Sequence, residues 1–192
     1  MTLTTINRVF IMAGIISAIL GLFGCKKSAG TESAGKGYEV ADVYKGLRQQ
    51  VLGLDPAELG VDTSASGGVC GVLMETGHPE AVATLVVIAD GTVSMYFSNG
   101  GGVIGAGEQS GPRAAALKLL SSTPEFLQHA ERTEDFPLPQ EGHTRFYFLT
   151  HDGVFTVDAL EDDLGNERSP LSPLFYKAQD VITQLRLMQQ NP

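Results

Sequence analysis

The chain has 192 residues and carries 22 Asp and Glu against 13 Lys and Arg, a formal net charge of −9. Because nucleic acids and anionic lipid headgroups repel an acidic surface, this balance argues against nucleic acid as a partner. The length suits one domain with a full hydrophobic core.

The first 25 residues predict export from the cytoplasm. One basic residue, Arg8, precedes an uncharged apolar run of 15 residues from Val9 to Phe23. That run is shorter than the roughly 20 residues that span a bilayer, and with its basic start it is typical of a secretory signal. It leads into Leu22-Phe23-Gly24-Cys25, which resembles the lipobox of bacterial lipoprotein precursors.

The resemblance implies that a signal peptide, residues 1–24, is removed and that Cys25 becomes the lipid attachment site. The membrane would then be a partner of the chain through this N-terminal lipid, and the protein would belong to the bacterial cell envelope. Lys26 after the cysteine favours the outer membrane, on its periplasmic face, in a Gram-negative bacterium. The alternative is an uncleaved N-terminal anchor in which Cys25 has no role.

The rest of the chain predicts a tether and a single domain. Residues 25–37 are small and polar after the cysteine, which indicates a flexible linker. Residues 38–192 form the domain. Its first helix is predicted from an apolar stripe at i, i+3, i+4, i+7 and i+11, made by Val40, Val43, Tyr44, Leu47 and Val51. The polar face of that helix carries Asp42, Lys45, Arg48 and Gln49.

Turn signals and β-rich runs follow this helix. Asp55 is placed to cap a short helical turn that begins at Pro56. Two Asp-Gly pairs, Asp90-Gly91 and Asp152-Gly153, join β-branched and aromatic runs, which predicts hairpins with type I′ turns. The strands are expected over residues 69–76, 82–89, 92–98, 144–150 and 154–160. Further helical segments are expected to start near Pro112, at Thr123-Pro124 and at Ser172-Pro173.

These elements predict an α+β fold in the order α-β-β-β-α-β-β-α. Tight turns join neighbouring strands only in antiparallel fashion, so the expected sheet is a single antiparallel sheet of about five strands packed by helices. The order resembles the topology of the chaperones of type III secretion and of related small α+β domains that bind peptides or proteins. The resemblance concerns architecture only, and a shared architecture does not establish a shared function.

The stretch "SNGGGVIGAGEQSGPR", residues 98–113, contains Gly100-x-Gly102-x-x-Gly105, the spacing of a dinucleotide-binding fingerprint. The fingerprint requires a helix that opens on the glycines, but here no helix is expected before Ser110. The preceding strand also belongs to a hairpin and not to a parallel unit. The glycines are therefore expected to bend the backbone.

Two further hypotheses remain for this stretch, namely a loop that a partner approaches closely or an anion site at the start of the next helix. The candidate ligand or partner loop consists of Gly100, Gly101, Gly102, Val103, Ile104, Gly105, Gly107, Ser110 and Arg113.

No catalytic, metal or cofactor motif is found. The histidines, His78, His129, His143 and His151, lack metal-ligand spacing. The acidic run Glu161-Asp162-Asp163 lacks the pattern of a calcium loop and predicts a solvated turn. Cys70 lies in an apolar run, which predicts a buried thiol rather than a nucleophile. If Cys25 is lipidated, no second cysteine is left for a disulfide.

The sequence thus predicts a lipid-anchored envelope protein whose domain binds a protein or peptide without catalysis. Its partner is expected to be another envelope component. One alternative is an envelope hydrolase that uses His143 or His151 with Asp90 or Asp152. The other is an anion or nucleotide binder at the loop from Gly100 to Arg113.

Overall fold

A computed structural model describes residues 38–190 of the chain. The predicted signal peptide, the lipid attachment site at Cys25 and the tether up to residue 37 lie outside the described residues. Within residues 38–190, no helix combines the length and the apolar character that a membrane span requires.

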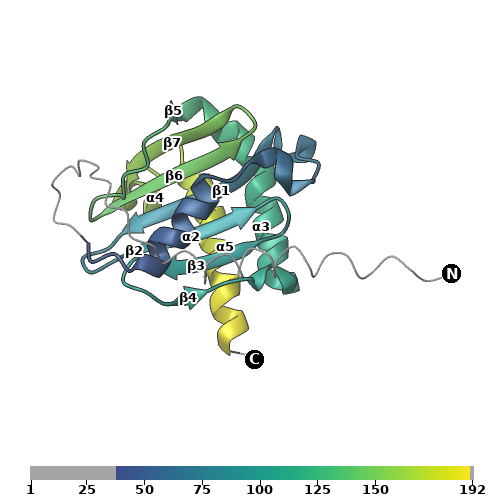
Figure 1. Cartoon of the computed structure of the whole chain (residues 1–192). Coiled ribbons are helices and arrows are strands. Elements are labelled where there is room, and N and C mark those ends of the chain that lie inside the picture. Colours follow the sequence, from purple (N-terminus) through teal and green to yellow (C-terminus); the bar gives the residue numbers. More distant parts are fainter. Residues whose placement is uncertain (1–37, 191–192) are drawn as a thin grey trace, which may run out of the picture. The chain divides into compact units, whose positions relative to one another are not determined.

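The described residues form an α+β fold built on one antiparallel sheet, as the sequence predicts (Figure 1). The prediction of about five strands is wrong, because the sheet has seven, in the order β4-β3-β2-β1-β6-β7-β5. Their bounds are β1 Val69–Gly77, β2 Val82–Ile88, β3 Val93–Phe97, β4 Gly102–Val103, β5 Glu131–Thr133, β6 His143–Thr150 and β7 Gly153–Leu160.

The two unpredicted strands are β4 and β5, which form the two edges of the sheet. They have two and three residues, which is too short for an alternating apolar pattern to be recognised. Four α-helices accompany the sheet in the described residues, namely α2 Asp42–Leu52, α3 Ser110–Ser122, α4 Glu161–Gly165 and α5 Ser172–Gln190. Short 3-10 helices lie at Pro56–Leu59, Ser64–Ser66, Ala106–Glu108 and Thr123–His129.

Local signals account for several of the element boundaries. The carboxylate of Asp55 accepts a hydrogen bond from the backbone N–H of Ala57, which caps the turn that begins at Pro56. Both Asp-Gly hairpins are present, but only the glycines, Gly91 (φ 97°) and Gly153 (φ 115°), have positive φ. That pattern fits a type I turn followed by a glycine bulge and not the expected type I′ turn.

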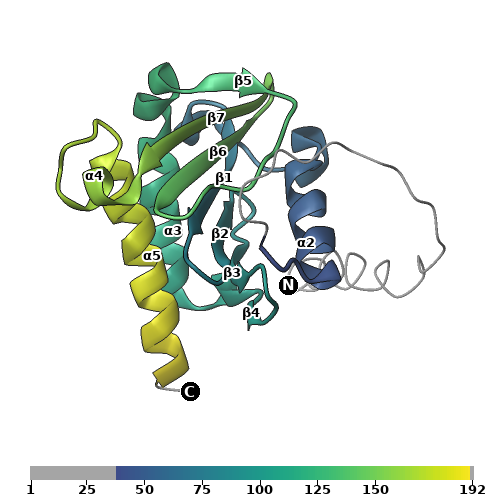
Figure 2. The same ribbon diagram turned by 90° about the vertical axis from the view of Figure 1, so that its left-hand side faces the viewer.

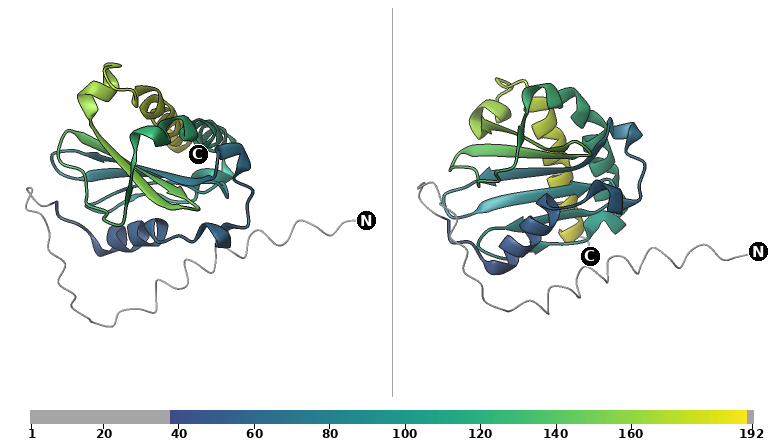
Figure 3. Two further views of the ribbon diagram at one scale, coloured as in Figure 1. Left: turned by 90° about the horizontal axis from the view of Figure 1, so that it is seen from above. Right: turned by 45° about the horizontal axis from the view of Figure 1, so that its top comes forward.

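The sheet is covered on both faces (Figures 2 and 3). Helices α3 and α5 cover one face, where Phe146 and Phe148 of β6 belong to the larger hydrophobic cluster. Helix α2 crosses the other face, called the α2 face below, where Tyr44 packs with Leu73 and Tyr147 in a smaller cluster. Because both faces are covered, the central strands β1 and β2 are buried along their whole length.

Candidate binding groove

A hollow opens on the α2 face beside the edge strand β4. It encloses about 200 Å³, and two parts of the chain that lie apart in the sequence meet there, namely α2 and the continuous stretch from the end of β3 into the glycine loop. We call it the edge groove, and its lining consists of Val43, Tyr44, Leu47, Tyr96, Phe97, Gly100, Gly101, Gly102 and Ile104. The start of α2 is fixed beside it, because the N–H of Ala41 donates to the carbonyl of Ser98 at 2.8 Å.

Three large apolar side chains of the edge groove stay exposed to solvent. Val43 is 57% exposed, Ile104 58% and Phe97 37%. Phe97 and Ile104 belong to one stretch of the chain, whereas Val43 comes from α2, so the fold brings Val43 beside the other two. Exposed apolar side chains gathered around a hollow make it a candidate surface for a partner.

The glycines explain why the groove is open. Gly100 and Gly101 have φ of 102° and 81°, values that side-chain-bearing residues rarely adopt. A Cβ on Gly101 would meet no atom within 4 Å, and one on Gly100 would meet only the Cβ of Ala41 at 4.0 Å. The backbone of these residues is therefore uncovered on the groove side.

The second half of the predicted loop, from Gly105 to Arg113, does not line the edge groove but packs on the β2–β3 turn and leads into α3. A Cβ on Gly107 would lie 1.6 Å from the carbonyl oxygen of Gly91, so Gly107 packs directly on the β2–β3 turn. The guanidinium of Arg113 fills the space above Gly91, and its Nη1 donates to the carbonyl of Gly107 at 3.5 Å. Gly105 has a φ of 77° and Ser110 opens α3, so this half joins the loop to the turn and to the helix.

Val103, also predicted for the loop, points to the other face of the sheet and packs against the larger hydrophobic cluster. Of the predicted loop, Gly100, Gly101, Gly102 and Ile104 line the edge groove.

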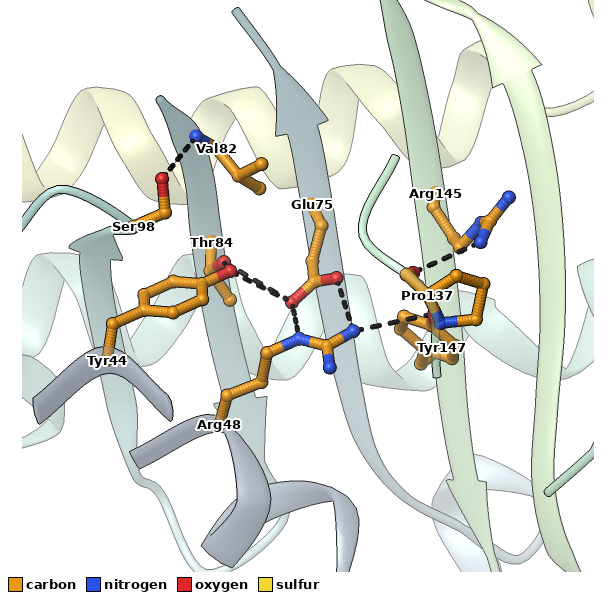
Figure 4. Close-up of polar contacts among 9 residues, drawn as sticks. All are labelled: Tyr44, Arg48, Glu75, Val82, Thr84, Ser98, Pro137, Arg145 and Tyr147. Atoms are coloured by element: carbon orange, nitrogen blue, oxygen red, sulfur yellow. Dashed lines mark hydrogen bonds and ion pairs between the residues drawn. The ribbon is translucent and has the colours of Figure 1, made fainter. Parts of the chain in front are cut away.

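A buried ion pair holds α2 on the sheet (Figure 4). The side chain of Glu75, on the central strand β1, has no exposed surface, and that of Arg48 is 13% exposed. Arg48 donates from Nε to Oε1 at 2.7 Å and from Nη2 to Oε2 at 2.9 Å, a bidentate contact. The sequence pattern places Arg48 on the polar face of the helix, and that prediction is wrong.

Neighbouring hydroxyl groups complete the shell of this carboxylate. Thr84 donates to Oε1 of Glu75 at 3.3 Å, and its hydroxyl shares a 2.8 Å hydrogen bond with Tyr44. On the other side, Arg48 reaches the hydroxyl of Tyr147, which donates to the carbonyl of Pro137 at 2.7 Å. The network joins α2, β1, β2, β6 and the loop before β6, and so it fixes one wall of the edge groove.

Burial raises the pKa of Tyr44, Tyr96 and Tyr147, and the nearby carboxylate of Glu75 adds to each shift. A tyrosine whose pKa is raised by folding stabilises the folded state fully below its unfolded pKa of about 10, and this stability is lost as the pH rises through the folded value. We therefore expect the free energy of unfolding to fall above about pH 10, measured by urea unfolding at about pH 8 and about pH 11.

Tyr96→Phe is the matched control for this pH dependence. The hydroxyl of Tyr96 is buried and has no hydrogen-bond partner among the described residues, so its removal should leave stability near neutral pH unchanged or higher. The variant should lose less stability at alkaline pH than the unmodified chain. Equal stability of the unmodified chain at both pH values would contradict the prediction.

A second hollow, of about 370 Å³, lies at the opposite edge of the sheet between β5, β6, β7 and the segment that precedes β6. Two of its charged side chains are paired, because Arg145 contacts Asp158 at 3.1 Å, and Arg145 also donates to the carbonyl of Pro137. His143, at the start of β6, contacts Asp158 through Nδ1 at 2.6 Å. The pairing uses groups that a ligand would otherwise require.

No hydrogen bond or ion pair in residues 38–190 links His143 or His151 with Asp90 or Asp152. His143 pairs with Asp158, whereas Nε2 of His151, after the other end of β6, lies 3.2 Å from Oγ1 of Thr63. Asp90 accepts a hydrogen bond from the N–H of Thr92 within its own turn.

The other residues that the sequence singled out, namely the metal-ligand types, the acidic run and Cys70, make ordinary structural contacts. No group of three or more His, Cys, Asp or Glu in residues 38–190 is arranged to hold a metal ion. The acidic run forms the short helix α4, where Asp162 and Asp163 pair with Arg168. Cys70 is buried as predicted, its thiol donates to the carbonyl of Leu149 at 3.1 Å, and burial raises its pKa.

Sequence reasoning found the glycine loop but missed the other walls of the groove and the ion pair beneath α2. A signal for the ion pair is present, because Arg48 follows the stripe residue Tyr44 by four positions and Glu75 interrupts an apolar strand. Comparison with known proteins gave no match to a family model, to a curated protein or to a solved structure.

Proposed function

We propose that this domain is a non-catalytic protein-binding module of the bacterial cell envelope, which binds its partner at the edge groove. The observation that carries the proposal is the exposure of Val43, Phe97 and Ile104 around one hollow at the edge of the sheet. The lining is aliphatic, aromatic and glycine-rich, which is the composition of a contact surface rather than of a site for proton transfer.

The proposed lipid anchor would limit how far the edge groove lies from the membrane. Residues 26–37 separate the lipid attachment site at Cys25 from the described domain, and twelve residues reach at most about 40 Å when fully extended. Helix α2, which forms one wall of the groove, begins at Asp42, soon after this tether ends. A partner at the groove would therefore be held close to the membrane surface.

Replacing Ile104 by glutamine should abolish binding of the partner protein at the edge groove. The side chain is 58% exposed, so Ile104→Gln is expected to change the free energy of unfolding by less than about 0.5 kcal/mol. The measurement is affinity isolation of the full-length chain from detergent-solubilised membranes of cells that produce it. We expect one specific protein to be recovered with the unmodified chain and lost with Ile104→Gln.

Leu117→Gln is the matched control, because Leu117 is 51% exposed on α3, on the face of the sheet opposite α2. The control should recover the partner in full. Recovery of the same proteins by all three chains would contradict the groove as the binding surface.

The anchor is tested by mass spectrometry of the N-terminus of the chain taken from membranes. The expected product begins at Cys25 with a diacylglyceryl group on its thiol, and Cys25→Ala should leave an uncleaved precursor. An unmodified Cys25 in a chain that retains residues 1–24 would contradict the lipid anchor.

A further inference from the structure

The edge groove lies beside a strand with one free side. Strand β4 is the first in the sheet order, and it pairs with β3 only through Met95 with Val103 and Tyr96 with Gly102. No other strand of the described residues pairs with its outer side. An unpaired strand edge is a template on which another chain can add a strand.

The backbone at this edge is oriented for such an addition. The carbonyl of Gly101 accepts the N–H of Phe97 at 3.1 Å, and Val103 pairs with Met95, so both residues face β3. Successive residues of an antiparallel strand direct their N–H and C=O groups to alternate sides. The backbone groups of Gly102 therefore face away from β3, toward the open side, and Ile104 follows β4 directly.

The side chains alternate in the same way. Val103 packs against the cluster beneath α3 and α5, whereas Gly102 and Ile104 line the edge groove. A strand added outside β4 would direct every second side chain to the α2 face, beside the exposed side chains of Val43 and Ile104. Apolar residues at those alternate positions would cover them.

The charge of the domain restricts the occupant further. Residues 38–190 contain 21 Asp and Glu against nine Lys and Arg, a formal net charge of −12. Glu39 just before α2 is exposed, and Asp42, next to Val43 in α2, has a side chain that is 88% exposed although it pairs with Lys45 at 3.2 Å. Such a surface repels a second copy of itself and attracts a basic segment.

We propose that the occupant of the edge groove is an extended, basic segment of a partner protein that adds to β4 as a further strand. Its alternate residues are apolar and contact Val43 and Ile104, and its other residues carry positive charge, which the net charge of −12 of the domain as a whole attracts. This inference rests on the proposed function and specifies the class of partner.

The test uses synthetic peptides of about seven residues, the length of an ordinary strand, and fluorescence polarisation with the full-length chain in detergent micelles. One peptide alternates Val with Lys, a second alternates Val with Glu, and a third is the Val–Lys peptide with all its backbone amides methylated. The Val–Lys peptide should bind saturably. Methylation removes the N–H donors that strand addition needs, so the third peptide should bind at least about tenfold more weakly.

The charge and the site are tested in the same series. The Val–Glu peptide should bind at least about tenfold more weakly than the Val–Lys peptide, and added salt should weaken the Val–Lys complex. Ile104→Gln should weaken binding of the Val–Lys peptide by a similar factor, whereas Leu117→Gln should leave it unchanged.

Absence of Val–Lys binding, equal binding of the methylated peptide, equal binding of the Val–Glu peptide, or binding that Ile104→Gln leaves unchanged would each overturn the inference. The proposed function would still stand if Ile104→Gln alone abolished recovery of a membrane protein. It would fail separately if all three chains recovered the same proteins.

Discussion

Replacing Arg48 by methionine is expected to lower the free energy of unfolding by about 3–5 kcal/mol, because it leaves the carboxylate of Glu75 buried without its charged partner. The pair is bidentate and its carboxylate has no exposed surface, so water cannot replace the guanidinium without opening α2. The measurement is urea unfolding near neutral pH, followed by circular dichroism.

Two variants control for this effect. Lys45→Met changes a lysine of the same helix whose exposed pair with Asp42 contributes at most about 1 kcal/mol. Arg48→Met combined with Glu75→Leu removes both charges and should regain most of the lost stability. A loss below about 1 kcal/mol for Arg48→Met would show that the ion pair does not hold α2 on the sheet.

Gly107→Ala should destabilise the domain by about 3 kcal/mol or more, the upper end of what overpacking costs. Its Cβ would lie 1.6 Å from the carbonyl oxygen of Gly91, so the backbone of the loop or of the β2–β3 turn must move. The measurement is again urea unfolding, and the displaced loop should also weaken any complex formed at the edge groove.

Gly46→Ala is the matched control, because a Cβ on Gly46 in helix α2 would meet no atom within 4 Å. Glycine in a helix costs about 0.5–1 kcal/mol relative to alanine, so this variant should gain stability of that size. If Gly107→Ala were as stable as the unmodified chain, the account of Gly107 as a close backbone contact would be wrong.

The elements that the sequence predicts are those with local causes. Asp55 caps its turn through a neighbouring N–H, the Asp-Gly pairs form hairpins, and α3 begins at Ser110 as the late position of Pro112 suggests. Each depends on residues within one turn of the chain. The edge strands β4 and β5 depend instead on pairing with β3 and β7, and their sequences carry too few residues to show a pattern.

The candidate site also combines a feature that local sequence predicts with features that depend on contacts between distant segments. The glycine loop is visible in the sequence, but Val43 joins it only because α2 crosses the sheet beside β3. The pairing of Arg48 with Glu75 links residues 27 positions apart, and a helical-wheel argument assigns a charged residue at the border of the apolar stripe to solvent. Contacts between distant segments decide both features, and no local pattern specifies them.

The central claim, that a partner occupies the edge groove, is tested most directly by site-specific photo-crosslinking in living cells. A photoreactive phenylalanine analogue is placed at position 104 in one chain and at position 117 in another, two exposed sites on opposite faces of the sheet. The account predicts one discrete adduct with a single envelope protein from position 104 and none from position 117. No adduct at position 104, or the same adducts from both positions, would contradict it.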